Sequence, residues 1–235
     1  MPKVEANGIT INYEQQGEGE PLILIPYLAA DNACYAFQVG EYAKHFTCIS
    51  VDPRGAGETD KPEGVYSTEL FADDLSALMR ALKVERAHIS GLSLGAAVGM
   101  WLAAKYPQQV KVGGSGSVTE TVIQGIFPWC FTPELYVVQP DYIESLAAFV
   151  RGRPAQPVDA FMRQSNAVIA HDVEPHLGKI TAPTQVTYGR YDMVTGQRFA
   201  ELMKAKIRRA ELIVFEGCAH APIYMRRWTS SIEGR

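Results

Sequence analysis

The chain has 235 residues, which is enough for one domain with a sizeable hydrophobic core. Its net charge is −4 and it has no run of basic residues, so nucleic acid is not expected as a partner. No stretch approaches the ~18 apolar residues that a membrane-spanning helix needs, and the first residues lack the pattern of a signal peptide. Composition therefore argues against the nucleic-acid-binding and membrane classes.

The cysteines are scattered along the chain and show no Cys-x-x-Cys spacing. Such usage suits a reducing compartment and carries no metal-binding signature. We therefore expect a cytoplasmic protein without a metal site. The cysteines are Cys34, Cys48, Cys130 and Cys218.

The first half of the chain alternates apolar runs with helix-forming stretches. Asn7-Gly8 between two short alternating runs predicts a β-hairpin. Residues 22–25 form a continuous apolar strand that suits the centre of a sheet. A helix is expected over residues 31–44, and another strand over residues 46–51. This alternation predicts a doubly wound, mostly parallel sheet of the α/β class.

The most specific motif is Gly-Leu-Ser-Leu-Gly at residues 91–95. It follows the apolar run 84–89 and precedes the helix-forming run 96–106. A Gly-x-Ser-x-Gly in this strand–turn–helix context is a nucleophile elbow, in which the serine stands on a sharp turn at the carboxyl end of a strand. Ser93 is therefore the candidate nucleophile. A serine hydroxyl needs a base to take its proton, so the elbow predicts a histidine and a carboxylate further along the chain.

Both partners follow the ends of later predicted strands. Asp192 comes just past a strand and a glycine turn at residues 184–189, and His220 comes shortly after the strand at residues 211–216. Catalytic groups gather at the carboxyl ends of strands in open α/β sheets. We therefore expect Ser93 as nucleophile, Asp192 as acid and His220 as base.

Two alternatives remain open from the residues alone. Asp172, next to His171, is a rival acid, but it lies in a segment that looks helical rather than at a strand end. Cys218 is close to His220 and could itself be a nucleophile, although an ordinary buried thiol has the same appearance.

The segment between the elbow and the acid is rich in aromatic residues near its start and has no obvious strand. An insertion of this kind, over residues 117–178, predicts a helical cap above the strand ends. An ordinary helical layer is the alternative. Phe127 and Trp129 are expected to line a substrate pocket, because large apolar side chains there would bury a small acyl group.

These motifs together resemble the α/β-hydrolase superfamily, in the branch of small esterases, 3-oxoadipate enol-lactonases, carbon–carbon bond hydrolases and non-haem haloperoxidases. The resemblance implies a cofactor-free serine hydrolase acting on a small ester or lactone through an acyl-enzyme. It also implies that the backbone N–H of Leu94 is one donor of the oxyanion hole. The motifs that carry the resemblance are Asp52-Pro53-Arg54-Gly55-Ala56-Gly57, the elbow, Gly189-Arg190-Tyr191-Asp192 and Gly217-Cys218-Ala219-His220.

The chain departs from the family pattern before the second oxyanion donor. The family usually has His-Gly there, and this chain has Pro26-Tyr27-Leu28. Proline has no N–H to donate, so Leu28 is the expected donor and Tyr27 a weaker candidate. The Tyr27 side chain is expected to reach the substrate, with simple packing as the alternative.

Two further departures indicate that this chain lacks elements that the family fold has. Residues 113–116, Gly-Gly-Ser-Gly, have the composition of a flexible linker and stand where the family has a sheet strand. A natural glycine loop is the alternative. The resemblance also implies a last helix that this chain lacks, and residues 229–235 resemble a protease-cleavage tag. We therefore expect a trimmed or engineered chain, missing one strand and the last helix, that forms a homo-oligomer through an exposed sheet edge.

The expected organisation is an N-terminal core part, a glycine linker, a helical cap, a C-terminal core part and a tag remnant. The leading function is hydrolysis of a small-molecule ester or lactone, with neither nucleic acid nor membrane as partner. The alternatives are a ligand-binding or signalling protein with little turnover, and a trimmed scaffold with impaired activity. The five segments are 1–112, 113–116, 117–178, 179–228 and 229–235.

Overall fold

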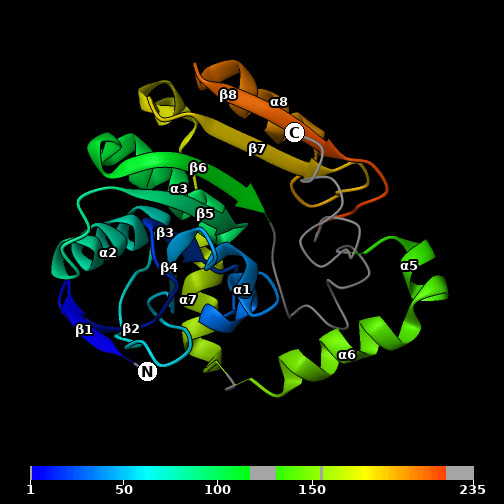
Figure 1. The fold of residues 1–235 in the computed structure, drawn as a ribbon, viewed down its shortest axis with the longest axis horizontal. Coiled ribbons are helices and arrows are strands. Elements are labelled where there is room, and N and C mark those ends of the chain that lie inside the picture. The colour runs from blue at the N-terminus through cyan, green and yellow to red at the C-terminus, as the bar shows by residue number, and fades with distance from the viewer. Residues whose placement is uncertain (1, 117–130, 154–155, 221–235) are drawn as a thin grey trace.

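The computed structural model describes residues 2–116, 131–153 and 156–220, and these form an eight-stranded sheet with helices on both faces (Figure 1). The strand order is β1-β2-β4-β3-β5-β6-β7-β8. Strand β2 pairs antiparallel with β1 and β4, and the other strand pairs are parallel. This is the mostly parallel, doubly wound sheet that the sequence predicts. The strands are β1 (Lys3–Ala6), β2 (Ile9–Gln16), β3 (Glu20–Ile25), β4 (Phe46–Val51), β5 (Ala87–Leu92), β6 (Val110–Gly116), β7 (Thr184–Gly189) and β8 (Ala210–Phe215).

The predicted hairpin is confirmed between β1 and β2. Asn7 and Gly8 have φ angles of 50° and 74°, and two successive residues at positive φ make the turn that follows the twist of paired strands. Asparagine and glycine are the residues that adopt this conformation most readily, which is why the pair is a strong hairpin signal.

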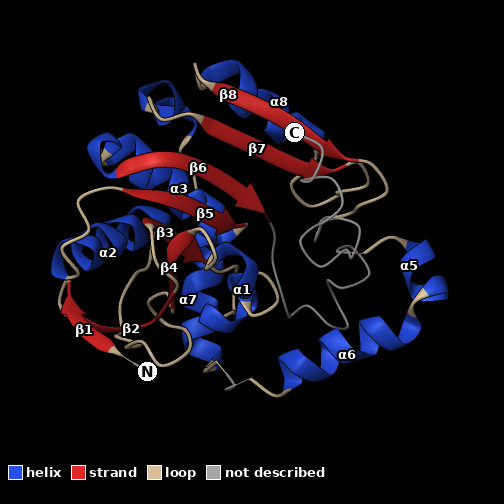
Figure 2. Cartoon of the chain, viewed as in Figure 1, coloured by secondary structure: helices blue, strands red, loops and turns tan. Residues whose placement is uncertain are grey.

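Both faces of the central strands are buried, as their continuous apolar sequence predicts. Along β3, Ile23 and Ile25 belong to the core under one helical layer, and Leu22 and Leu24 belong to the core on the opposite face. Figure 2 shows these helices against the sheet. The first layer contains α2 (Thr68–Ala81), α3 (Leu94–Lys105), η2 (Pro107–Gln109) and α8 (Gln197–Lys206), and the second contains η1 (Asn32–Tyr35) and α1 (Val39–Tyr42).

The single helix expected over residues 31–44 is wrong in form, because the chain makes two short helical turns there, η1 and α1. Asp31 is nevertheless the predicted cap. Its side chain accepts a hydrogen bond from the N–H of Ala33 at 3.1 Å.

The expectation of a missing strand at the glycine segment is also wrong. Residues 113–116 are the second half of β6, between β5 and β7. Gly113 is paired with Ile89 on one side and with Thr184 on the other. The segment is therefore a sheet strand rather than a linker, and the sheet has no gap at this place. The argument for an oligomer at such a gap loses its basis, and oligomerisation stays a prediction. The last helix and the tag fall on residues 221–235, outside the described part of the chain.

The chain between the elbow and the acid contributes helices in its described parts. Figure 1 shows α5 and α6 on the side toward which the arrows of β5 to β8 point. Residues 117–130 lie outside the described ranges. Among the residues described, no helix is long and apolar enough to cross a membrane. The helices of this segment are α5 (Pro133–Val138), α6 (Pro140–Arg151), α7 (Val158–Ile169) and η3 (Glu174–Lys179).

Candidate active site

The elbow serine stands in a strained conformation between β5 and α3. Ser93 has φ 47° and ψ −105°, a region that residues other than glycine rarely occupy. The neighbouring glycines allow the tight turn. A Cβ on Gly91 would lie 2.2 Å from the carbonyl oxygen of Gly95, and a Cβ on Gly95 would lie 2.2 Å from that of Ile25. The two glycines therefore bring the start of α3 against the end of β3 and hold Ser93 at the strand end.

Asp192 and His220 meet at the carboxyl ends of β7 and β8. Nδ1 of His220 lies 2.7 Å from Oδ2 of Asp192, and both side chains are almost fully buried. Oδ1 of Asp192 accepts hydrogen bonds from the N–H groups of Val194 and Thr195 at 2.8 and 2.9 Å. Burial by itself would raise the pKa of Asp192, but the hydrogen bond from His220, its charge and the two N–H groups outweigh burial and lower that pKa. Asp192 is therefore an ionised acceptor that orients the imidazole.

The other ring nitrogen of His220 is free to accept a proton. Nε2 is buried and has no hydrogen-bond partner among the described residues. Because Nδ1 is paired with a carboxylate, the neutral ring carries its proton on Nδ1 and its lone pair on Nε2. No hydrogen bond joins Nε2 to Ser93 within the described chain. Such bonds are often long in enzymes without substrate and tighten when substrate binds.

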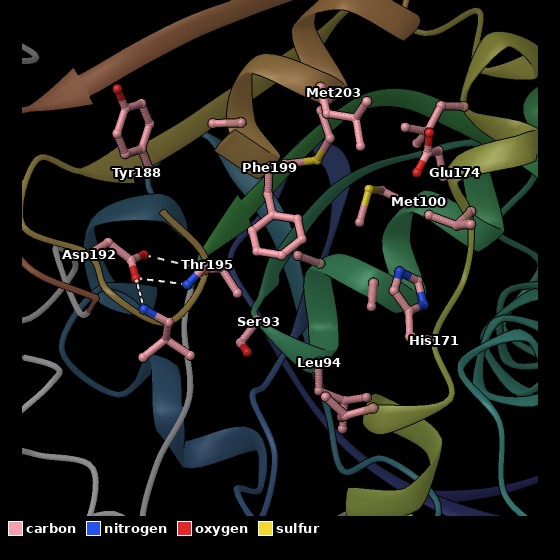
Figure 3. Close-up of a pocket in the computed structure, with 18 of the residues that line it drawn as sticks. Ser93, Leu94, Met100, His171, Glu174, Tyr188, Asp192, Thr195, Phe199 and Met203 are labelled. Carbon is pink, nitrogen blue, oxygen red and sulfur yellow. Dashed lines mark hydrogen bonds between the residues drawn. The ribbon is translucent and has the colours of Figure 1, made fainter. Parts of the chain in front are cut away.

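Ser93 and this pair line one cavity of about 400 Å³, within the ~300–1,000 Å³ range of small-molecule sites. Figure 3 shows Ser93 between Asp192 and His171, beneath Phe199. The wall is mostly aliphatic and aromatic and comes from α3, α7, η3 and α8. The end of α7 and η3 therefore line the site, and the cap over residues 117–178 stays a prediction.

The predicted oxyanion donors are the backbone N–H groups of Leu94 and Leu28. Leu94 is the first residue of α3, where an N–H has no partner within the helix. Leu28 lies in a turn closed by a hydrogen bond from Ala30 N to Tyr27 O at 3.2 Å. This turn directly follows the end of β3, against which the elbow rests. Both predicted oxyanion donors are therefore on segments that the elbow brings together.

The structure does not place Tyr27 in the cavity. Its side chain is 3% exposed and packs on the second face of the sheet with Leu24 and Tyr35. Continued alternation would place position 27 on the Ile25 face, but β3 ends at Ile25 and the chain turns at Pro26, so the side chain packs on the opposite face instead. Phe127 and Trp129 lie outside the described residues.

The sequence left two alternatives open, Asp172 as the acid and Cys218 as the nucleophile, and the structure favours neither. Asp172 lines the cavity, but it accepts a hydrogen bond from the N–H of Glu174 at 3.2 Å, whereas His220 bonds to Asp192. Burial raises the pKa of the Cys218 thiol, which disfavours the nucleophilic thiolate. Among the described residues no group of three or more His, Cys, Asp or Glu side chains gathers as a metal site.

Sequence reasoning missed two side chains next to the site. His171 lines the cavity and its Nδ1 lies 2.9 Å from the hydroxyl of Thr68, on α2. Gln164, on α7, is fully buried and contacts loops from the first third of the chain. No local signal marks either residue, because both partners are about a hundred positions away.

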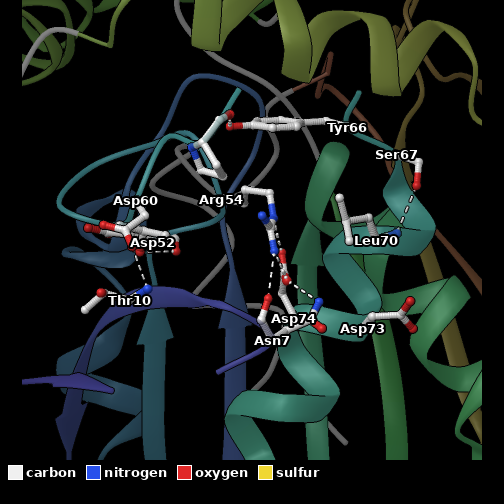
Figure 4. A network of polar contacts seen from close by, with 12 residues as sticks. Asn7, Thr10, Asp52, Arg54, Asp60, Tyr66, Ser67, Leu70, Asp73 and Asp74 are labelled. Carbon is white, nitrogen blue, oxygen red and sulfur yellow. Dashed lines mark hydrogen bonds and ion pairs between the residues drawn. The ribbon is translucent and has the colours of Figure 1, made fainter. Parts of the chain in front are cut away.

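The loop after β4 is held by a buried ion pair (Figure 4). Nη2 of Arg54 lies 2.6 Å from Oδ1 of Asp74, with both side chains less than one-tenth exposed, and Asn7 donates to the same oxygen at 2.7 Å. Asp52 accepts hydrogen bonds from the N–H groups of Asn32 and Glu58 at 2.7 and 2.8 Å. The Asp-Pro-Arg-Gly-Ala-Gly motif is thus a structural support near the site.

Arg54→Ala is expected to lower the free energy of unfolding by about 3–5 kcal/mol, because it leaves the carboxylate of Asp74 buried without its cation. Urea denaturation measures this change. The matched control is Arg151→Ala, which breaks an exposed pair with Glu144 and should cost less than about 1 kcal/mol. Equal effects of the two variants would contradict the structural role of the Arg54 pair.

Comparisons with known proteins agree with this fold. Residues 19–112 match the family model described as alpha/beta hydrolase fold. The chain is 27% identical to the 2-(acetamidomethylene)succinate hydrolase of Mesorhizobium japonicum, over 93% of this chain and 87% of that protein. It is 25% identical to 3-oxoadipate enol-lactonase 2 of Acinetobacter baylyi, over 90% of this chain and 86% of that protein.

A similar solved structure is that of Est816, described as an N-acyl homoserine lactone degrading enzyme. It superposes with a TM-score of 0.85 at 27% identity and covers 99% of both chains.

Proposed function

The chain belongs to the α/β-hydrolase superfamily, where it resembles the enol-lactonase-like branch, and on that premise we propose that it cleaves a small carboxylic ester or lactone through an acyl-enzyme on Ser93. The observation that carries this proposal is the strained elbow serine and the Asp192–His220 pair around one cavity. Its relatives are hydrolases, which supports the broader class.

In this mechanism His220 is the base. Nε2 takes the proton as Oγ of Ser93 attacks the substrate carbonyl, and the imidazolium that forms is stabilised by the ionised Asp192. The same proton then passes to the leaving oxygen. Water attacks the acyl-enzyme in the second half of the reaction, again with Nε2 as base, and carboxylic acid is released.

The tetrahedral oxyanion would lie against the N–H groups of Leu94 and Leu28. Leu94 adds the positive end of the α3 dipole, which favours negative charge at this point. One such donor typically contributes ~10²–10³ in rate, so the turn that carries Leu28 is a sensitive part of the site.

A fluorophosphonate probe tests the proposal without the natural substrate. We expect an adduct on Ser93, located by mass spectrometry, and steady hydrolysis of p-nitrophenyl butyrate. A ligand-binding protein with little turnover would label without steady hydrolysis, and an adduct elsewhere would contradict the assignment. The third alternative, a trimmed scaffold, loses its main support because β6 is in place.

Gln164 holds the turn that carries Leu28. Its Oε1 accepts a hydrogen bond from the N–H of Ala29 at 3.3 Å, and its Nε2 donates to the carbonyl of Arg54 at 2.9 Å. Ala29 has a φ of 64°, which costs energy for a residue with a Cβ and needs support from its surroundings. We infer that Gln164 is a positioning residue, through which α7 orients the second oxyanion donor.

Gln164→Ala is expected to lower kcat by about 10–100-fold with little change in KM, because a donor displaced by about 1 Å acts only weakly on the transition state. Steady-state kinetics with p-nitrophenyl butyrate measure the split. The control is Arg163→Ala on the same helix, which removes a hydrogen bond to the carbonyl of Lys61 and leaves the hydrogen bonds of Gln164 to Ala29 and Arg54 in place. Equal losses of kcat in both variants would indicate a general structural effect.

A further inference from the structure

His171 is a polar residue in the wall of the cavity, and the mechanism described above does not use it. It follows the end of α7 and lines the cavity together with Ser93. Figure 3 shows its ring on the opposite side of Ser93 from Asp192, facing the same space as Met100 and Phe199. A hydrogen-bonding group at this place lies beside the space for a substrate that is bound to Ser93.

A buried threonine holds this ring. Nδ1 of His171 lies 2.9 Å from the hydroxyl of Thr68, which is the first residue of α2. The two nitrogens of an imidazole point in different directions, so Nε2 faces away from Thr68. Within the described chain no hydrogen bond holds Nε2, and the ring lines the cavity. Nε2 is therefore the nitrogen that His171 offers to a ligand.

The Thr68 hydroxyl decides which nitrogen carries the hydrogen. Thr68 is only 2% exposed, and a buried O–H group needs an acceptor. Nδ1 of His171 is the one hydrogen-bond partner of this hydroxyl among the described residues, so the hydroxyl donates to Nδ1. Burial lowers the pKa of His171, against the smaller opposite effect of Asp172, so the ring is mainly uncharged at neutral pH. A neutral ring that accepts at Nδ1 carries its hydrogen on Nε2.

The place of His171 relative to the catalytic pair indicates which part of the substrate it meets. In the proposed mechanism His220 returns the proton to the leaving oxygen, so the leaving group lies on the side of His220 and Asp192. The acyl group then extends from Ser93 toward the opposite side, where the ring of His171 is. In a mostly apolar wall, one N–H group is a specific partner for an oxygen atom of the acyl group.

We propose that His171 is a specificity-determining residue, whose Nε2–H donates a hydrogen bond to an uncharged acceptor on the acyl group, such as a keto or amide oxygen. Thr68 is the positioning residue that holds the ring and its tautomer. This inference rests on the proposed function and deepens it, because it names the substrate class. A plain alkyl group would displace water from this N–H without offering an acceptor, which is unfavourable.

Two p-nitrophenyl esters of equal acyl length, the levulinate and the pentanoate, test the proposal. They have the same leaving group, and the levulinate has a keto oxygen in place of two hydrogens. A second pair with one more methylene before the ketone covers the next position along the acyl chain. For each pair, the ratio of kcat/KM for the keto ester to that for the alkyl ester is measured at neutral pH. Comparing this ratio between the wild type and a variant cancels the intrinsic reactivity of the esters.

His171→Phe is expected to lower the ratio by about five- to tenfold in at least one pair, which is the typical effect of one hydrogen bond between uncharged groups. The loss should appear mainly in KM, because the bond is made in the ground state and in the transition state alike. His171→Gln keeps an N–H group near the place of Nε2 and should retain most of the wild-type ratio. The matched control is His176→Phe, because His176 packs on Trp101 and is not among the described lining residues.

Thr68→Val tests the positioning role, because it removes the hydroxyl with little change of shape. We expect it to lower the ratio by about threefold, and Thr68→Ser should keep the wild-type value. Equal ratios in the wild type and His171→Phe for both pairs would overturn the inference and leave the proposed function in place. Equal falls in His171→Phe and His171→Gln would overturn it too, since they would indicate a structural role of the ring. Hydrolysis of none of the esters, with no fluorophosphonate labelling of Ser93, would overturn the proposed function and the inference that rests on it.

Discussion

Ser93→Ala is expected to reduce the hydrolysis of p-nitrophenyl butyrate by about 10⁶-fold and to abolish labelling by a fluorophosphonate. Removing the nucleophile leaves only the weak catalysis that binding and the oxyanion hole provide. The alanine keeps the Cβ and needs no change in the elbow, so the circular dichroism spectrum and the urea midpoint should stay close to those of the wild type.

The control for this variant is Ser145→Ala. Ser145 lies on α6, where its hydroxyl donates to the carbonyl of Asp141 on the surface. It should keep full activity and full labelling. Persistent labelling of Ser93→Ala at another serine, or residual hydrolysis within a factor of ~10² of the wild type, would reject Ser93 as the nucleophile.

Asp192→Asn is expected to lower kcat by about 10⁴-fold. An asparagine can donate its amide hydrogen to Nδ1 of His220, which moves the ring proton to Nε2. The nitrogen that faces the cavity would then have no lone pair for the Ser93 proton. The kinetics of p-nitrophenyl butyrate hydrolysis measure the loss, and the urea midpoint reports any loss of stability.

The double variant Ser93→Ala/Asp192→Asn tests whether Asp192 acts together with Ser93 or independently of it. Residues that act as a unit do not have additive effects, so the double variant should be as slow as Ser93→Ala alone. Asp172→Asn is the matched control, because it neutralises a carboxylate of the cavity wall that does not bond to His220, and it should change kcat less than ~3-fold. A large loss in Asp172→Asn with little effect of Asp192→Asn would identify the wrong carboxylate.

The parts of the fold that follow from local sequence were predictable. The hairpin turn depends on Asn7 and Gly8 alone, and the elbow depends on small residues within five positions. The placement of Asp192 and His220 follows from a general rule, since the carboxyl ends of parallel strands meet at one edge of the sheet. The pairing of these two residues was therefore expected before any coordinates.

The glycine segment shows where local composition is misleading. Gly-Gly-Ser-Gly has a low strand propensity, and by itself it resembles a linker. In the sheet it pairs with β5 and β7 on both sides, so backbone hydrogen bonds to two neighbours decide its conformation. Glycine side chains contribute nothing to that choice, which is why the sequence pattern does not report it.

By itself, the sequence determined the α/β class, the elbow with Ser93 and the meeting of Asp192 with His220, because these depend on short-range backbone requirements and on strand order. Only the tertiary structure decided that β6 completes the sheet, that Tyr27 is in the core and that Gln164 supports the turn of Leu28. The lining of the cavity was decided there too, because its wall combines α3, α7, η3 and α8. Contacts between such distant segments depend on how the elements pack in three dimensions, and no spacing along one chain encodes them.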